Sequence, residues 1–386
     1  MKRTLISFLA FLLILPCAAW AADVIKIGLN IELTGDIPEV GEFSKNVAKL
    51  FETKINAAGG WDVGGKKYKI QFIIEDNESK AESAVTVATK LITSDNVLVM
   101  VGPQASKQAI AAGEVANNLK TPMISPWSTN PATTLNRPYV FRGCFLDDFQ
   151  CKVIAKFVTE EYKAKKAAVL YDIASDAPKG QAEFFKKAFE SIHGPGSVTA
   201  FETFTTKDVD FSAQLTKIVK SGADILFTPQ YYNEVPLIIN QAKQLGWTKP
   251  IVGSDAWAGG DLMGMCGKDC NGYFFTCHSV SKGAKGITKE FVDSYNAAYH
   301  KNPDSVAALT WDSLNIVLAA IQKTGGLTGD LKKDRQAVTD QIGKLKDFPG
   351  VTGAFTYMPG GNPSKCVPIT KIDAKEGFVF YKTVCP

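Results

Sequence analysis

Residues 97–131 read VLVMVGPQASKQAIAAGEVANNLKTPMISPWSTNP, and this stretch decides the fold class. It begins with an apolar run at 97–101 and contains a second at 122–125, each with the length and composition of a short buried strand. The segment between them is rich in small residues and predicts a helix that ends about Leu119. Two short strands joined by a helix predict neighbouring parallel strands of an α/β sheet.

The same alternation extends toward the N-terminus. Ser79 and Glu82 have the spacing of a capping box, which predicts the start of a helix that reaches about Ile92. The elements expected before residue 97 are, in chain order, a strand at 24–31, a helix at 42–58, a strand at 68–74 and that helix.

A second set of units begins after Asn136-Arg137-Pro138. Asp147 and Gln150 have the spacing of another capping box, ahead of a helix that ends near Lys163. The strands expected next are 167–171, 197–204, 224–228 and 250–253, and the helices between them are near 179–191, 211–220 and 234–245. From about residue 287 the pattern becomes helical, and a short strand near 353–357 and a hairpin follow. We therefore expect an α/β protein with two doubly wound parallel-sheet domains of similar size.

The composition is that of an ordinary globular protein. The chain has 386 residues, with 43 basic and 39 acidic side chains in no long run of one sign, so its charge gives no case for binding nucleic acid. Three histidines far apart in the sequence argue against a histidine-rich metal site. The sequence also lacks a P-loop, a GxGxxG after a strand and a GxSxG elbow, so we expect no cofactor and no enzyme.

The first residues have the pattern of a secretory signal peptide. Lys2 and Arg3 precede an apolar stretch at 5–15, and Ala19-Trp20-Ala21 supplies a small-x-small cleavage site. We expect cleavage after Ala21, giving a signal peptide at 1–21 and an exported mature protein, whose periplasmic location is implied by the family resemblance given below. The apolar run is short for a membrane anchor, and Pro16 before Cys17 fits a lipidation site poorly. We expect no other stretch to cross a membrane.

Export favours disulfides over zinc for the cysteines that follow the signal peptide. The segments 366–372 and 378–384 predict a hairpin around the turn 374–377. In that hairpin Asp373 faces Phe378, and the same register places Cys366 opposite Cys385, so we expect this disulfide. Two further pairs are open, Cys266 with Cys270 and Cys144 with Cys151, and at least one thiol is left over because seven cysteines remain after Cys17.

Polar residues follow the expected strands at the positions where open α/β sheets bind ligands. In the first domain, Ser106 opens the helix after 97–101, and Thr129 follows the strand at 122–125. Hydroxyls together with free backbone N–H groups at helix starts can hold a carboxylate. The alternative is that both residues only cap helices.

In the second domain, Asp255 lies just past the strand at 250–253. Tyr231 and Tyr232 follow the strand at 224–228, and an acid beside aromatic faces suits an ammonium group. The alternatives are a turn residue for Asp255 and core packing for the tyrosines. Trp127 and Trp257 can be read either as pocket walls or as core residues.

At these positions the sequence resembles the periplasmic binding proteins of branched-chain amino acid ABC transporters, the leucine/isoleucine/valine-binding type. The resemblance spans essentially the whole mature chain, and its strength lies in the order and spacing of many short motifs. Among them are Leu33-Thr34-Gly35, Glu75-Asp76, Gly102-Pro103, Ile124-Ser125-Pro126, Phe141-Arg142, Asp147-Asp148-Phe149-Gln150, Asp210-Phe211-Ser212 and Val351-Thr352-Gly353.

The resemblance implies a type I periplasmic binding protein, in which two doubly wound lobes are joined by a three-crossover hinge. The N-terminal lobe would comprise 22–142 plus about 278–360, and the C-terminal lobe 143–277 plus about 361–386. In the family, residues at the positions of Ser106 and Thr129 hold the ligand carboxylate. The backbone at Trp127 and an acid at Asp255 receive the ammonium, and a tyrosine at Tyr231 lines the second lobe.

The sequence departs from the family at three positions: an aromatic residue is missing near Val40, Ala177 replaces a tyrosine, and Pro178 replaces a glycine. These differences predict an enlarged or reshaped pocket. We expect a monomeric receptor that delivers an amino acid, apolar or branched-chain, to an ABC permease. The alternatives are a receptor for an aromatic or other organic acid and a sensor module for a membrane signalling protein.

Overall fold

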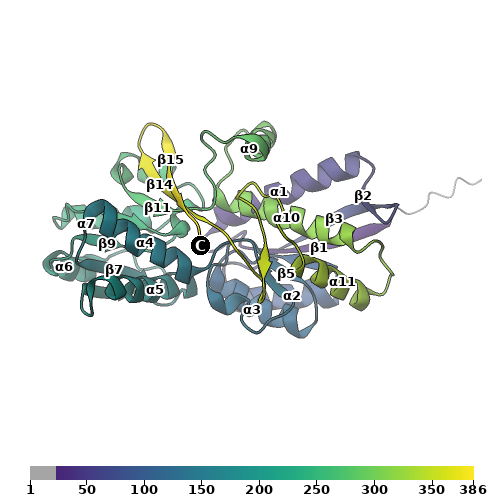
Figure 1. Ribbon diagram of the computed structural model, residues 1–386, viewed down its shortest axis with the longest axis horizontal. Coiled ribbons are helices and arrows are strands. Elements are labelled where there is room, and N and C mark those ends of the chain that lie inside the picture. The colour runs from purple at the N-terminus through teal and green to yellow at the C-terminus, as the bar shows by residue number, and fades with distance from the viewer. Residues whose placement is uncertain (1–22) are drawn as a thin grey trace, which may run out of the picture.

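The computed structural model describes residues 23–386 (Figure 1). The expected signal peptide and Cys17 lie outside the described residues. Two sheets lie side by side along the longest axis of the molecule, and helices cover both faces of each (Figure 1). The expected α/β architecture with two sheets is therefore confirmed.

The first sheet has six strands, and all neighbours except β2 and β3 are parallel. In sheet order the strands are β2 (Trp61–Val63), β3 (Lys66–Asp76), β1 (Val24–Ile31), β4 (Val99–Val101), β5 (Met123–Ser125) and β6 (Val140–Arg142). The helices associated with this sheet are α1 (Pro38–Ala57), α2 (Ala81–Thr93), α3 (Ser106–Asn118), α9 (Gly286–Tyr299), α10 (Ser305–Lys323) and α11 (Leu331–Gly343).

The second sheet has seven strands. Five of them are parallel to one another, and the two strands of the C-terminal hairpin join this set through antiparallel pairings. In sheet order the strands are β15 (Gly377–Val384), β14 (Val367–Asp373), β11 (Phe274–Thr276), β10 (Ile251–Gly253), β9 (Ile225–Phe227), β7 (Ala167–Asp172) and β8 (Val198–Phe204). Its helices are α4 (Asp147–Tyr162), α5 (Asp176–His193), α6 (Ser212–Lys220), α7 (Val235–Gln244) and the short α8 (Leu262–Cys266).

The chain passes between the two sheets three times. It leaves the first sheet after β6, returns after β11 to α9, and leaves again after the small ladder of β12 (Tyr357–Met358) and β13 (Asn362–Pro363), which contacts β6. The loops that follow β4, β5, β9 and β10 thereby face one another between the sheets. The residue boundaries expected for the two lobes remain a prediction.

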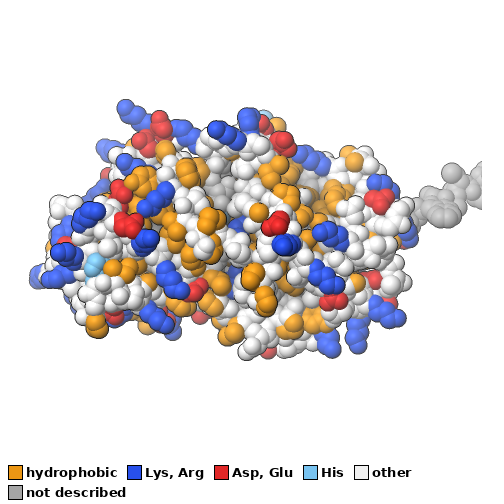
Figure 2. Space-filling model, in the orientation of Figure 1, with side chains coloured by type: hydrophobic (Ala, Val, Ile, Leu, Met, Phe, Trp, Pro, Cys, Tyr) orange, Lys and Arg blue, Asp and Glu red, His pale blue; other side chains and the backbone are white. Residues whose placement is uncertain are grey.

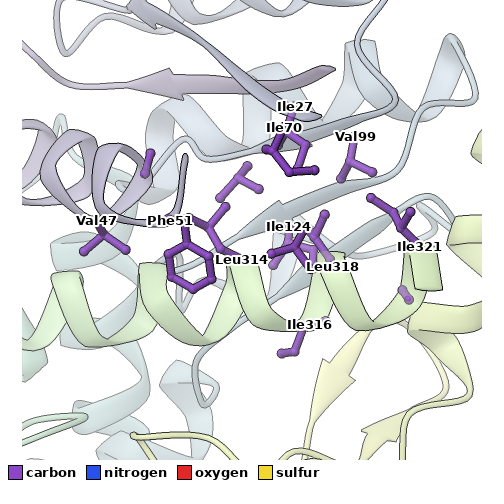
Figure 3. Packing of buried hydrophobic residues seen from close by; sticks show 14 of the residues in the cluster. Ile27, Val47, Phe51, Ile70, Val99, Ile124, Leu314, Ile316, Leu318 and Ile321 are labelled. Carbon is purple, nitrogen blue, oxygen red and sulfur yellow. The ribbon is translucent and has the colours of Figure 1, made fainter. Parts of the chain in front are cut away.

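The core of the first lobe is built around α10. In Figure 3, Leu314, Leu318 and Ile321 of this helix face strand residues such as Ile27 and Ile70 of the sheet. Among residues 23–386, α10 also has the length and apolarity of a membrane span, contrary to our expectation that no such stretch exists. Since 78% of its most apolar window is buried inside the protein, the structure accounts for α10 as a core helix. On the surface, basic and acidic side chains are interspersed (Figure 2).

The capping box expected from Ser79 and Glu82 is wrong. The residue that caps α2 is Lys80, with no side-chain hydrogen bond to the helix, and Ser79 has a left-handed backbone with φ of 56°. The Ser79 hydroxyl instead donates to the carbonyl oxygen of Thr34, 2.8 Å away. It therefore fastens the loop after β1 rather than the helix start.

The C-terminal hairpin contains the expected disulfide between Cys366 and Cys385, but its register near the turn differs from expectation. Asp373 pairs with Gly377 and not with Phe378. A bulge between Ile369 and Thr370 then shifts the pairing by one residue, so the strand ends meet as expected. A second disulfide joins Cys266 to Cys270. The other open pair is absent, since Cys144 and Cys151 are buried free thiols, as is Cys277.

We expect removal of the hairpin disulfide by Cys366→Ser with Cys385→Ser to lower the free energy of unfolding by about 3 kcal/mol in the chain-entropy model. The reason is that the bond spans 19 residues and restricts the unfolded chain. Cys266→Ser with Cys270→Ser serves as the control, because a bond that spans 4 residues removes less entropy, about 2 kcal/mol. Chemical denaturation of the three proteins measures both values, and a larger loss in the control would contradict the expectation.

Candidate ligand-binding site

A small cavity lies between the two sheets at the carboxyl ends of their strands. Its unfilled space, including the part open to solvent, is about 200 Å³, and its lining includes all five candidate residues, Ser106, Trp127, Thr129, Tyr231 and Asp255. The other lining residues are Gln104, Ala105, Ala177, Gln181 and Ala256. The structure thus brings the candidates together, while their contacts with a ligand remain a prediction.

The first sheet contributes hydroxyl groups and a helix start. Ser106 is the first residue of α3 and makes no capping hydrogen bond, so the alternative role as a cap does not apply to it. Its hydroxyl oxygen accepts from the Ser128 hydroxyl at 3.0 Å and from the backbone N–H of Asn130 at 3.4 Å. Thr129 is not a cap either, because Asn130 caps the short helix that follows. Backbone N–H groups in the first turn of α3 have no acceptor within the helix and are available to an anion.

Glu32, which the sequence analysis missed, organises the loop between β4 and α3. Its carboxylate is fully buried and accepts the backbone N–H groups of Gln104 at 3.1 Å and Ala105 at 3.2 Å. Burial raises the pKa of Glu32 to about 7, although these hydrogen bonds favour the charged form. These hydrogen bonds hold the loop that leads into Ser106, a residue of the cavity lining.

The second sheet contributes Asp255, which is 2% exposed and lies two residues after β10. Its neighbour Ser254 caps the short helix there, so Asp255 is free to turn its carboxylate inward. One carboxylate oxygen lies 3.0 Å from Nε2 of His278, and the other accepts from Nε2 of Gln181 at 3.2 Å. His278 stacks on Phe145 at 4.0 Å, and burial lowers its pKa despite the opposing effect of Asp255. A neutral His278 therefore donates its Nε2–H to Asp255.

Asp147 is a second buried acid beside Asp255. The capping box expected from Asp147 and Gln150 is wrong, because Asp147 is already inside α4 and its side chain makes no cap. Its Oδ1 accepts from Nε2 of Gln181 at 2.9 Å, and its Oδ2 has no partner among the described residues. Burial, and next the charge of Asp255, raise the pKa of Asp147 to about 7.

Gln150 and Gln181 complete the polar cluster, and neither was a candidate. Gln150 accepts the backbone N–H of Asp255 at 2.9 Å, which fixes the position of that residue. The amide nitrogen of Gln181 reaches three oxygens, on Asp147, Asp255 and Thr129. In this conformation Gln181 therefore supplies N–H groups to the acceptors that would otherwise receive an ammonium.

The aromatic candidates have different roles. Trp127 and Tyr231 both line the cavity, with ring centres 5.6 Å apart. Trp257 is a core residue that stacks on Phe275 and donates its indole N–H to the carbonyl oxygen of Thr228. Tyr232 is also buried in the core and does not line this cavity. The core alternative therefore holds for Trp257 and Tyr232 only.

Arg142, at the end of β6, supports the loop that carries Trp127 and Thr129. It is fully buried, and its guanidinium donates to the backbone carbonyls of Ser128 and Asn130 and to the side chains of Thr134 and Asn362. Burial lowers its pKa. Within residues 23–386 no cluster of histidine, cysteine, aspartate or glutamate has the arrangement of a metal site.

The comparisons with known proteins agree with this geometry. The leucine-, isoleucine-, valine-, threonine-, and alanine-binding protein of Pseudomonas aeruginosa is 29% identical over 89% of this chain and 88% of its own length. The isoleucine complex of LivJ, the branched-chain amino acid transporter substrate binding protein of Streptococcus pneumoniae, is 34% identical with a TM-score of 0.84 over 94% of this chain and 100% of its own. The leucine binding protein LivK of Thermotoga maritima is 29% identical, also with a TM-score of 0.84, over 94% and 99%.

The family model described as periplasmic binding protein matches residues 24–377. This match includes the first sheet, the second sheet up to the start of β15, the three passages between them and every residue that lines the cavity. The chain therefore belongs to the periplasmic binding protein family.

Proposed function

We propose that this protein is an extracytoplasmic receptor that encloses an amino acid between its two lobes and delivers it to an ABC permease. One observation carries the proposal: a group of hydrogen-bond donors and a buried carboxylate line the same cavity from opposite lobes. Ser106 and Thr129 would hold the α-carboxylate. Asp255 and the backbone at Trp127 would receive the α-ammonium, and Tyr231 would form a wall. A zwitterion matches both ends at once.

The named relatives support an amino acid as the ligand, since those proteins bind leucine, isoleucine and similar amino acids by name. They also support delivery to a permease in the membrane and a periplasmic location, and the N-terminal sequence pattern favours cleavage after Ala21. We further propose that the lobes 22–142 plus about 278–360 and 143–277 plus about 361–386 approach one another on binding. A ligand held by residues of both lobes favours that approach.

Mass spectrometry of small molecules released on denaturation is the direct test of the proposal. The protein is purified from its mature N-terminus, unfolded, and the released molecules are identified. Calorimetric titration of the refolded protein with the twenty amino acids then gives the affinities. We expect a released amino acid and saturable binding, and a protein that neither releases nor binds any amino acid would refute the proposal.

We expect binding to release a proton from Asp147. Its pKa of about 7 leaves it largely protonated at pH 6, and an ammonium beside Asp255 favours the charged form. Up to about one proton per ligand should therefore leave at pH 6, and the affinity should rise with pH until about pH 7. Calorimetry in buffers of different ionisation enthalpy measures the release, and Asp147→Asn should abolish it. Equal release by that variant would contradict the assignment.

A further inference from the structure

The lining of the cavity is unusually polar for a site that would hold an aliphatic side chain. Among the ten described residues that line it, none has an aliphatic side chain larger than that of alanine. The alanines at 105, 177 and 256 give room, and the aromatic walls are Trp127 and Tyr231. The remaining lining residues are polar, and two of them are the buried glutamines Gln104 and Gln181.

The amide of Gln104 has a defined orientation. Its Nε2 donates to the hydroxyl oxygen of Ser44 at 2.9 Å and to that of Thr310 at 3.3 Å. The single hydroxyl proton of Ser44 is donated to the backbone carbonyl of Val40, so Ser44 can only accept from Gln104. The nitrogen end of Gln104 is therefore fixed toward Ser44, and its Oε1 has no partner in the part of the chain that the structure describes.

The amide of Gln181 is oriented by Asp255. Its Nε2 donates to Asp147 at 2.9 Å and to Asp255 at 3.2 Å, and the carboxylate of Asp255, which also receives the Nε2–H of His278, can only accept. Its Oε1 is consequently the free end, and it too has no partner among the described residues. Trp127 adds a hydrogen-bond donor, since no acceptor within residues 23–386 contacts its buried indole N–H.

We propose that the ligand is an amino acid with a neutral polar side chain that carries hydrogen-bond donors, and that Gln104 and Gln181 select it. This inference rests on the proposed function and narrows its ligand class. A side-chain carboxamide is the best match, because its two N–H groups suit the two free glutamine oxygens and its oxygen suits the Trp127 N–H. A branched aliphatic side chain would leave all three groups buried and unpaired, which is costly.

The test uses ligands of nearly equal shape that differ in their donors. Asparagine, leucine and aspartate share one branched outline, but asparagine alone carries side-chain N–H donors. We expect calorimetry to give asparagine at least about tenfold tighter binding than leucine or aspartate, since each buried acceptor left unpaired costs roughly that factor. Threonine and valine form a second matched pair, in which threonine should bind more tightly.

Variants of Gln104 and Gln181 test whether these two side chains cause the preference for asparagine over leucine. Gln104→Met and Gln181→Met keep an unbranched side chain of similar size, and each should lower the asparagine-to-leucine affinity ratio about tenfold or more. Because Gln181 also contacts Asp255, its change affects the ammonium end of both ligands, and that effect cancels in the ratio. Gln108→Met is the control: Gln108 is a buried glutamine of the same helix as Ser106, also with an unpaired Oε1, but it lies outside this cavity. The asparagine-to-leucine affinity ratio of the Gln108→Met variant should equal that of the wild type.

The outcomes separate the two proposals. Leucine binding as tightly as asparagine, aspartate binding as tightly as asparagine, or a ratio unmoved by both glutamine variants would overturn the polar-ligand inference and leave an amino-acid receptor in place. Absence of binding for every amino acid would refute the proposed function and this inference with it.

Discussion

Asp255→Asn is expected to weaken amino-acid binding by about 2–5 kcal/mol, the range for truncating one partner of a buried charge pair. The carboxylate is 2% exposed, so an ammonium bound to it gives up its water. A desolvated cation without an anionic acceptor is strongly disfavoured, and asparagine keeps the shape of the side chain while removing the charge. Calorimetric titration with the amino acid that binds wild type most tightly measures the loss.

Two comparisons make the Asp255 result specific. Thr129→Val should weaken binding less, because it removes one hydroxyl among several groups near the ligand. Asp312→Asn is the matched control: Asp312 is also a buried acid, but it accepts from the backbone of Val351 and Thr352 and does not line the cavity. It should leave the affinity unchanged.

The result at Asp255 also decides between ligand classes. A receptor for an aromatic or other organic acid would be helped by losing a carboxylate, since like charges repel. For such a ligand, Asp255→Asn would leave binding unchanged or improve it. Asp147 strengthens this contrast, because a second buried acid next to Asp255 makes this side of the cavity still less suited to an anion.

The sequence predicted the parts of the site that follow strands directly. Ser106, Thr129 and Asp255 lie in loops at the carboxyl ends of β4, β5 and β10, where the alternation of strands and helices indicates a ligand site. The structure brings these loops together because the chain passes between the sheets three times.

The residues that were missed are carried by helices and distant segments. Gln181 lies within α5, and His278 follows β11, which was not among the strands expected from the sequence. Asp147 was misread because an acid followed three residues later by glutamine has the spacing of a cap, whereas here both side chains face the cluster around Asp255. Local spacing cannot reveal a partner that is 74 residues away, as Asp255 is from Gln181.

The C-terminal hairpin shows a similar limit. Pairing Cys366 with Cys385 from a uniform register reached the right partners, but the register itself was wrong at Asp373. The turn has three residues instead of the expected four, which shifts the pairing by one residue, and the later bulge shifts it back. A bulge adds one residue to one strand, and no alternation pattern in a short amphipathic hairpin distinguishes it from a longer turn.

Arg142→Met is expected to cost both stability and affinity. The guanidinium holds the carbonyls of Ser128 and Asn130, which flank Thr129, and methionine would leave these buried acceptors unpaired. At about 1–3 kcal/mol for an unsatisfied buried group, the free energy of unfolding should fall by roughly 2–4 kcal/mol. Amino-acid affinity should fall about tenfold or more, since the loop that carries Thr129 would no longer be held in its binding conformation.

Arg335→Met is the control that distinguishes the loss of stability expected for Arg142→Met from its loss of affinity. Arg335 is likewise a buried arginine that donates to backbone carbonyls, those of Ile92 and Val97, but it lies on α11 and does not line the cavity. Chemical denaturation should show a comparable loss of stability in both variants, while calorimetry should show lost affinity only for Arg142→Met. If the Arg335 variant lost as much affinity, the effect would come from general loosening of the lobe. In that case Arg142 would not be the residue that positions the ligand loop.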